Sequence, residues 1–166
     1  MKAKNRQRTP RRRGEVLLIT VLLLGGCSGS RVLNMTVKGS SDLNSCDETP
    51  GGNAAIVRIY QLSNDTNFRT VTLEAFWNDD STALGNEMTS SRQLRLFPND
   101  VKSLEIEPDE TAQFIGVAAD LRCPDPERWR QVCALSELKG KQITVEINRD
   151  RVAINVQCAG RNRDRR

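Results

Sequence analysis

The 166-residue sequence contains no histidine. Histidine is the general base of Ser-His-Asp and Cys-His catalysis and a common ligand of metal ions, so its absence excludes those mechanisms and every His-based metal site. The chain also lacks a glycine-rich phosphate loop and the spacing of an EF-hand. Its serine hydroxyls have no base to activate them, and the sequence therefore argues against an enzyme.

Aromatic residues are scarce, at 4% of the chain, and no apolar run is long enough to cross a membrane. The run at residues 16–24 (VLLITVLLL) contains nine residues. As a helix it would be about 14 Å long, half of the roughly 30 Å that a bilayer core requires. Hydrophobic residues still make up 37% of the chain, which is enough for one folded domain.

The start of the chain has the features of a secretory signal. Residues 1–14 contain seven basic residues and no acidic one, and the short apolar run follows them. The run leads into Leu24-Gly25-Gly26-Cys27, which resembles the bacterial lipobox, where a signal peptide is removed before a cysteine that becomes lipid-modified. We therefore predict that residues 1–26 are cleaved and that Cys27 carries a covalent lipid. An ordinary signal peptide with an incidental cysteine is the alternative.

The predicted lipid also indicates a compartment. The residue after the cysteine is Ser28, and because an aspartate at this place favours inner-membrane retention in enteric-type sorting, serine suggests the outer membrane by resemblance. Residues 27–31 would form a tether that spans at most about 17 Å. We expect a domain held close to the periplasmic face of the outer membrane.

Most of the positive charge lies outside the predicted domain. The whole chain has a formal net charge of +4. Without the leader and the basic tail, residues 159–166, it has 14 basic and 19 acidic residues. The remaining body is thus mildly acidic, which removes the basic face that a nucleic-acid-binding protein needs. The tail is predicted to be a solvated, disordered end, and nothing in the sequence indicates a cofactor or a small-molecule substrate.

Four cysteines remain in the predicted domain, at Cys46, Cys123, Cys133 and Cys158. In an oxidising compartment an even number of cysteines indicates disulfides, and three pairings are possible. Because Cys123 and Cys133 bracket a single loop, we predict that they pair, which leaves Cys46 for Cys158. A Cys₄ zinc site is the alternative, but no CxxC spacing supports it.

The body of the chain, residues 32–158, alternates between apolar and polar residues, as β-strands do. The pattern predicts seven or eight short strands in an antiparallel β-sandwich, separated by turn residues such as Pro98-Asn99-Asp100. The clearest strands lie at residues 33–38, 55–62, 94–96, 104–107, 114–121, 143–147 and 152–156. Only residues 72–79 and 125–138 look helical. We expect Leu73, Phe76 and Trp77 to pack on one end of the sandwich.

The order of these features resembles a known family. After the lipobox come AIVRIYQL at residues 55–62, LEAFWNDD at residues 73–80, a Phe-Ile-Gly-Val-Ala-Ala strand that starts at Phe114, and Trp129-Arg130. The sequence is similar to the TssJ family (also called SciN or Lip), the outer-membrane lipoprotein of the type VI secretion system. The resemblance implies a transthyretin-like β-sandwich with a short helical addition.

The resemblance also implies a partner and a binding site. Members of the family bind the periplasmic C-terminal part of the inner-membrane protein TssM through the loop between the first two strands. Here that loop matches residues 40–53, with the candidate contact residues Asp42, Leu43, Asn44, Asp47, Glu48 and Thr49. This chain departs from the family in its four cysteines and in having Pro98-Asn99 where a Pro-Gly turn is usual. A disulfide at Cys46 would order the loop before it binds.

Two other functions are compatible with a small tethered sandwich. One is an unrelated lipoprotein that acts as a binding or chaperone module. The other is an accessory module that binds carbohydrate or peptidoglycan, which requires an exposed aromatic platform. Only Tyr60, Trp77 and Trp129 could supply such a platform.

Overall fold

The structure, a computed structural model, describes residues 32–46 and 51–158. The predicted signal peptide, Cys27 with its predicted lipid and tether, and the basic tail lie outside these residues. Within the described part, no helix is long and apolar enough to span a membrane.

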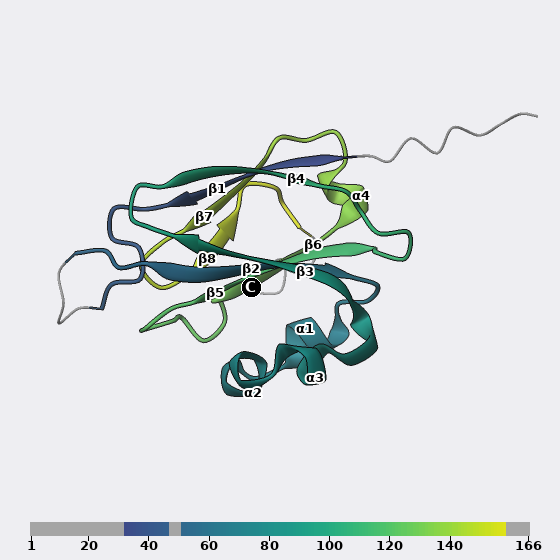
Figure 1. Cartoon of the computed structure of the whole chain (residues 1–166), viewed down its shortest axis with the longest axis horizontal. Helices are drawn as coiled ribbons and strands as arrows, with labels where there is room; N and C mark the ends of the chain where they lie inside the picture. The colour runs from purple at the N-terminus through teal and green to yellow at the C-terminus, as the bar shows by residue number, and fades with distance from the viewer. Residues whose placement is uncertain (1–31, 47–50, 159–166) are drawn as a thin grey trace, which may run out of the picture.

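Two four-stranded sheets pack face to face, with the strand orders β4-β1-β7-β8 and β3-β2-β5-β6 (Figure 1). The fold is therefore the predicted all-β sandwich. All strand pairs are antiparallel except β1–β7, which is parallel. The strands are β1 (Leu33–Gly39), β2 (Ala55–Leu62), β3 (Met88–Leu96), β4 (Val101–Ile106), β5 (Phe114–Asp120), β6 (Arg130–Ala134), β7 (Ile143–Ile147) and β8 (Val152–Ile154).

The main core lies between the two sheets, and the alternation in the sequence accounts for it. In β1, Leu33, Met35 and Val37 are buried, whereas the residues between them are not. Successive side chains of a strand point to opposite faces, so one set of alternate residues is directed inward. In β7, Ile143, Val145 and Ile147 meet the same core.

The sheet that contains β2 and β5 is buried on both faces. Tyr60 and Ala118 point away from the main core into a second cluster, together with Phe68, Phe76 and Trp129. Three short helices cover this outer face of the sheet (Figure 1). Leu73, Phe76 and Trp77 thus pack with this cluster and not, as the sequence suggested, on one end of the sandwich. The helices are α1 (Thr66–Thr70), α2 (Leu73–Asn78) and α3 (Asp80–Leu84), followed by a 3₁₀ turn, η1 (Gly85–Glu87).

Polar contacts attach this helical layer to the sheet. The hydroxyl of Tyr60 donates to Asp80 Oδ2 at 2.5 Å, and Arg58 Nη1 donates to the same oxygen at 3.0 Å. Burial, followed by the hydrogen bond to Asp80, raises the pKa of Tyr60. The Arg58 guanidinium lies 4.9 Å from the centroid of the Trp77 ring. Strand β2 is therefore bound to α2 and α3 by stacking as well as by hydrogen bonds.

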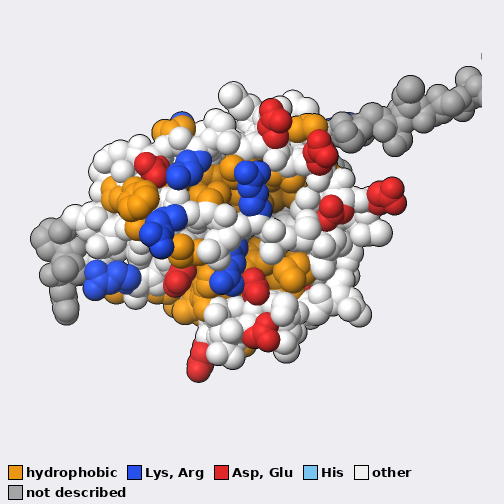
Figure 2. All heavy atoms as spheres, viewed as in Figure 1, with side chains coloured by type: hydrophobic (Ala, Val, Ile, Leu, Met, Phe, Trp, Pro, Cys, Tyr) orange, Lys and Arg blue, Asp and Glu red, His pale blue; other side chains and the backbone are white. Residues whose placement is uncertain are grey.

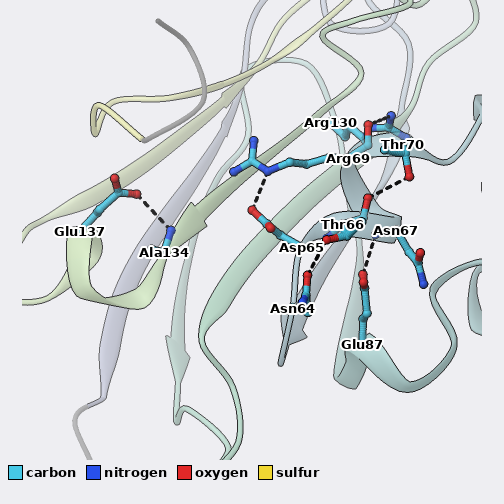
Figure 3. A network of polar contacts seen from close by, with 10 residues as sticks. All are labelled: Asn64, Asp65, Thr66, Asn67, Arg69, Thr70, Glu87, Arg130, Ala134 and Glu137. Atoms are coloured by element: carbon cyan, nitrogen blue, oxygen red, sulfur yellow. Dashed lines mark hydrogen bonds and ion pairs between the residues drawn. The ribbon is translucent and has the colours of Figure 1, made fainter.

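Arg130 connects β6 to the end of α1 in the same way. Its Nη2 donates to the carbonyl of Arg69 at 2.6 Å (Figure 3). Its Nη1 donates to the carbonyl of Val71. The guanidinium lies 4.4 Å from the centroid of the Trp129 ring. Burial lowers the pKa of Arg130 to about 10, so the group stays charged at neutral pH. The Trp-Arg pair noted in the sequence thus closes one side of the helical layer.

The predicted helix at residues 125–138 is wrong in most of its length. Residues 130–134 form β6, which pairs with β5, and only α4 (Leu135–Leu138) is helical. Before β6, a tight turn directs the amides of Arg128 and Trp129 to the carbonyl of Asp125. Trp129, Val132 and Cys133 are buried. Their spacing in the sequence fits the buried face of a helix as well as an edge strand. The hydrogen-bonded pairing with β5 makes residues 130–134 a strand.

The predicted disulfide pairing is also wrong. Cys46 is bonded to Cys123, and Cys133 is bonded to Cys158, with Cα–Cα distances of 5.7 and 5.0 Å. Cys133 lies opposite Ile115 near the start of β5, whereas Cys123 follows the end of that strand. About 17 Å of extended strand separates these two positions, so proximity in the sequence does not bring them together. Since all four sulfurs are in disulfides, they are not available as thiolate ligands for zinc.

Gly116 is the point where β5 meets the aromatic cluster, and it provides a test of this packing. A Cβ added there would lie 2.8 Å from Phe68 Cζ, and the Phe68 ring is fully buried. We expect Gly116→Ala to lower the free energy of unfolding by about 1–3 kcal/mol through overpacking, measured by urea denaturation. In the background of Phe68→Leu, the same substitution should cost less, because a smaller side chain makes room. Equal costs in the two backgrounds would contradict the assigned contact.

Candidate functional site

Four connections lie at one end of the sandwich, which we call the loop end. They are residues 40–54, 97–100, 121–129 and 148–151, and they gather at the left of Figure 1. The register of β1 explains this placement. Its last residues, Lys38 and Gly39, lie opposite Val101, the first residue of β4, and Ile147, the last residue of β7. The first residue of β1, Leu33, lies at the opposite end, which we call the anchor end.

The loop between β1 and β2 is held by its own buried residues. Leu43 is fully buried and Asn44 is 5% exposed. Asn44 Nδ2 donates to the carbonyl of Ala54 at 2.7 Å, and its Oδ1 accepts from the amide of Arg122 at 2.6 Å. Asn44 has a φ of 53°, a left-handed conformation that asparagine tolerates better than most residues. One side chain thus joins both ends of the loop to the segment after β5.

The Cys46–Cys123 disulfide makes a second connection between the same two segments. The segment after β5 is in turn held by the β7–β8 turn, because the amide of Asp125 donates to the carbonyl of Asp150 at 2.8 Å. The loop, the β5–β6 connection and the β7–β8 turn therefore form one continuous surface.

The β3–β4 turn supports the loop from its other side. The amide of Asp100 donates to the carbonyl of Phe97 at 3.0 Å, and Asn99 has a φ of 63°. With Pro98 before it, this is a type II turn, in which the third residue must adopt a positive φ. Asn99 can do so, which explains why this chain does without the usual glycine. Gly52 of the loop lies so close to this turn that a Cβ would meet Pro98 at 2.6 Å.

The surface of the loop end is polar and carries both signs of charge. A hollow is lined by Asp42, Cys46, Cys123 and the turn at residues 148–151. Arg151 Nε lies 2.7 Å from Asp150 Oδ1, and this hydrogen bond lowers the pKa of Asp150. The lining offers hydrogen bonds and ion pairs but holds no pair of nucleophile and base. Such chemistry suits recognition of another macromolecule rather than catalysis.

The predicted contact residues differ in their exposure to solvent. Asp42 is exposed, and its Oδ1 accepts a hydrogen bond from Ser40 Oγ at 2.6 Å. Leu43 and Asn44 are buried and support the loop instead of presenting themselves to a partner. Asp47, Glu48 and Thr49, like Cys27, lie outside the described residues. The sequence analysis missed Arg122, Arg149 and Arg151 at the loop end, since only the shared end of separate connections brings them together.

The aromatic residues do not form a binding platform. Tyr60 is fully buried and Trp129 is 1% exposed. Trp77 is half-buried, and its ring meets the ring of Phe76 edge to face, with the two ring centroids 5.2 Å apart. Within the described residues, these three side chains belong to the packing of the helical layer, which removes the basis for a carbohydrate-binding module.

Comparisons with known proteins agree with this geometry. Residues 31–150 match the family T6SS-SciN, described as type VI secretion lipoproteins and including VasD, EvfM and TssJ. This is a family of structural lipoproteins and not one of enzymes. The match excludes the alternative of a lipoprotein unrelated to the TssJ family. A search of curated protein sequences found no match.

Several solved structures share the fold. The type VI lipoprotein TssJ1 from Pseudomonas aeruginosa aligns with a TM-score of 0.66 at 20% identity, over 78% of this chain and 98% of that one. Lip from Serratia marcescens, a membrane-bound component of the type VI secretion system, aligns with a TM-score of 0.66 at 20% identity, over 75% of this chain and 96% of that one. A structure described as the TssM C-terminal domain (869-1107) from EAEC aligns with a TM-score of 0.65 at 22% identity, over 74% of this chain and 96% of that one.

Asn44 provides a test of how the loop is held. We expect Asn44→Ala to lower the free energy of unfolding by about 2–4 kcal/mol, because it removes two buried hydrogen bonds and leaves alanine in a left-handed conformation. Asn44→Gly keeps the backbone conformation accessible and should cost less. Urea denaturation measures both variants. Amide hydrogen exchange at residues 43–46 should rise in both, and unchanged exchange would contradict the supporting role.

Proposed function

The chain belongs to the type VI secretion lipoprotein family, and from this membership we propose that it is an outer-membrane lipoprotein that anchors the type VI secretion membrane complex. It does so by binding the periplasmic C-terminal domain of the inner-membrane protein TssM. This proposal rests on the family match over residues 31–150. The surface that we assign to the contact is the loop end.

The direction of β1 supports this arrangement. The proposed lipid on Cys27 is six residues before Leu33 in the sequence, and Leu33 lies at the anchor end of the sandwich. The strand of seven residues then extends about 23 Å and delivers the chain to the β1–β2 loop at the loop end. A domain tethered at one end presents the opposite end to the periplasm. This is where a protein that reaches out from the inner membrane would meet it.

The rigidity of the loop supports the same assignment. Two connections, Asn44 and the Cys46–Cys123 disulfide, fix the loop to the segment after β5. A loop that is ordered before binding loses less conformational entropy when the complex forms. Exposed Asp42 and the charged turn at residues 148–151 then supply specificity through ion pairs and hydrogen bonds.

The lipid anchor is tested with Cys27→Ser. We expect this variant to move from the membrane to the soluble periplasmic fraction, because the thiol that accepts the lipid is gone. Ser28→Asp is the matched control, since it keeps the cysteine and should redirect the protein to the inner membrane. Cell fractionation with immunoblotting measures both. A Cys27→Ser protein that stays in the outer membrane would refute the anchor.

The binding surface is tested by charge reversal of one exposed residue. Asp42→Arg should weaken co-purification with the periplasmic domain of TssM by at least about tenfold in affinity, because it alters the centre of the loop end without touching its buried supports. Glu107→Arg is the control, because Glu107 is exposed and follows β4 at the anchor end. Equal binding by Asp42→Arg and the unaltered protein would remove the loop from the contact. Loss of binding in both variants would point to the anchor end.

A further inference from the structure

Strand β3 forms an open edge of the second sheet. Among the described strands it pairs only with β2. The β4–β5 connection covers the start of β3, because Thr89 and Ser90 donate hydrogen bonds to Asp109. Residues 91–96 come after this covered part. Ser91, Arg92, Gln93 and Arg95 are all exposed. Every second residue of such a strand directs its backbone N–H and C=O away from the sheet, where an added strand can bind them.

Basic side chains gather along this edge (Figure 2). Arg95 and Arg122 line one shallow hollow on the outer face of the sheet, together with Ile56 and a single acid, Asp120. Neither guanidinium forms an ion pair or hydrogen bond with any described residue. Arg92 donates only to the backbone carbonyl of Glu105, at 3.5 Å. Three arginines without a carboxylate partner are thus concentrated on a body whose overall charge is negative.

Two exposed apolar side chains continue the surface at the β3–β4 turn. Phe97 is 49% exposed and Val101 is 63% exposed, and together with Val32 they are the large hydrophobic residues that the described part leaves exposed. Phe97 follows directly on β3 and Val101 begins β4, the facing edge of the other sheet. We call Arg92, Arg95, Phe97, Val101 and Arg122 the β3 edge surface. It combines a free strand edge, uncommitted positive charge and apolar contact area.

We propose that the β3 edge surface binds an extended acidic segment of a partner protein, which adds to the sheet as a strand beside β3. Successive side chains of the added strand would point to opposite faces of the sheet. A carboxylate on the outer face would meet Arg95, and a second one three residues away, on the opposite face, would meet Arg92 at the opening between the two sheets. Backbone hydrogen bonds supply sequence-independent affinity, and the arginines select for acidic residues.

Pairing of two copies of this chain through β3 is the competing use of the same edge. It would place the arginines of one copy beside those of the other, and like charges on neighbouring strands oppose pairing. An acidic partner strand has the complementary charge. The β3 edge surface shares Phe97 and Arg122 with the loop end, but Arg92 and Arg95 lie on β3 itself. Variants of these two arginines therefore test this inference separately from the proposed contact with TssM.

The test uses the full-length protein in mild detergent and a fluorescein-labelled peptide of about ten residues with Asp at every third position and Thr between them, so that successive Asp side chains point to opposite faces of an added strand. Fluorescence anisotropy should show binding that weakens several-fold between about 50 and 300 mM salt. A peptide of the same length with Asn in place of Asp should bind at least about tenfold more weakly. Hydrogen exchange should show new protection in residues 91–96 when the acidic peptide is bound. Equal binding of the two peptides, or no binding, would overturn the proposal.

The double variant Arg92→Glu, Arg95→Glu should reduce binding of the acidic peptide at least about tenfold. The control Lys139→Glu, Lys141→Glu makes the same change of charge at exposed positions on the other side of the molecule and should bind as the unaltered protein does. Arg92→Gln, Arg95→Gln serves if charge reversal disturbs folding. Binding that is lost in Asp42→Arg but kept in the β3 variants would assign the peptide to the loop end, and protection of residues 91–96 without peptide would indicate self-association. Either result would overturn the proposal.

Discussion

The pairing of β1 is the constraint on which the rest of the arrangement depends. This strand lies inside its sheet, antiparallel to β4 and parallel to β7, and its buried side chains fix its register against both. A shift by one residue would turn Met35 and Val37 out of the core. The same register places the β3–β4 turn and the β7–β8 turn at the end where the β1–β2 loop lies, and the pairing of β2 with β5 places the β5–β6 connection there. The chain before Leu33 necessarily enters at the other end.

The loop end shows how a polar surface can be kept in one conformation without a large core of its own. Buried Leu43 belongs to the main core, Asn44 replaces missing backbone partners, and Cys46 adds a covalent bond to the segment after β5. The disulfide closes a separation of 77 residues, which restricts the unfolded chain as well as the folded loop. Exposed residues can therefore vary in such a loop while its shape is retained, because shape and contact are assigned to different residues.

The success of the sequence analysis follows the strength of the local pattern. Strands with strict alternation, such as β1 and β7, were predicted at nearly their observed bounds, and residues 55–62 were predicted as the strand that β2 forms. The helix at residues 125–138 was wrong because Val132 and Cys133 are buried in an edge strand whose partner, β5, is not a local feature. The disulfide pairing failed for the same reason, since strand length separates Cys123 from Cys133. Asn44 was selected as a contact residue, but only the three-dimensional structure reveals its supporting role. No local signal could have identified the β3 edge surface, because it joins residues from several segments.

The absence of histidine has a consequence beyond the exclusion of catalysis. Histidine is the one side chain whose ordinary pKa lies between about pH 5 and 8, and the described cysteines are held in disulfides. Hydrogen bonds from Thr82 lower the pKa of Asp79 to about 2, and burial lowers the pKa of Arg130 to about 10, so both groups are charged near neutral pH. In the part of the chain that the structure describes, the loop end and the β3 edge surface thus carry neither a histidine nor a free thiol. These surfaces combine charged side chains with a frame that two disulfides hold together, which suits the proposed role of keeping an assembly in place.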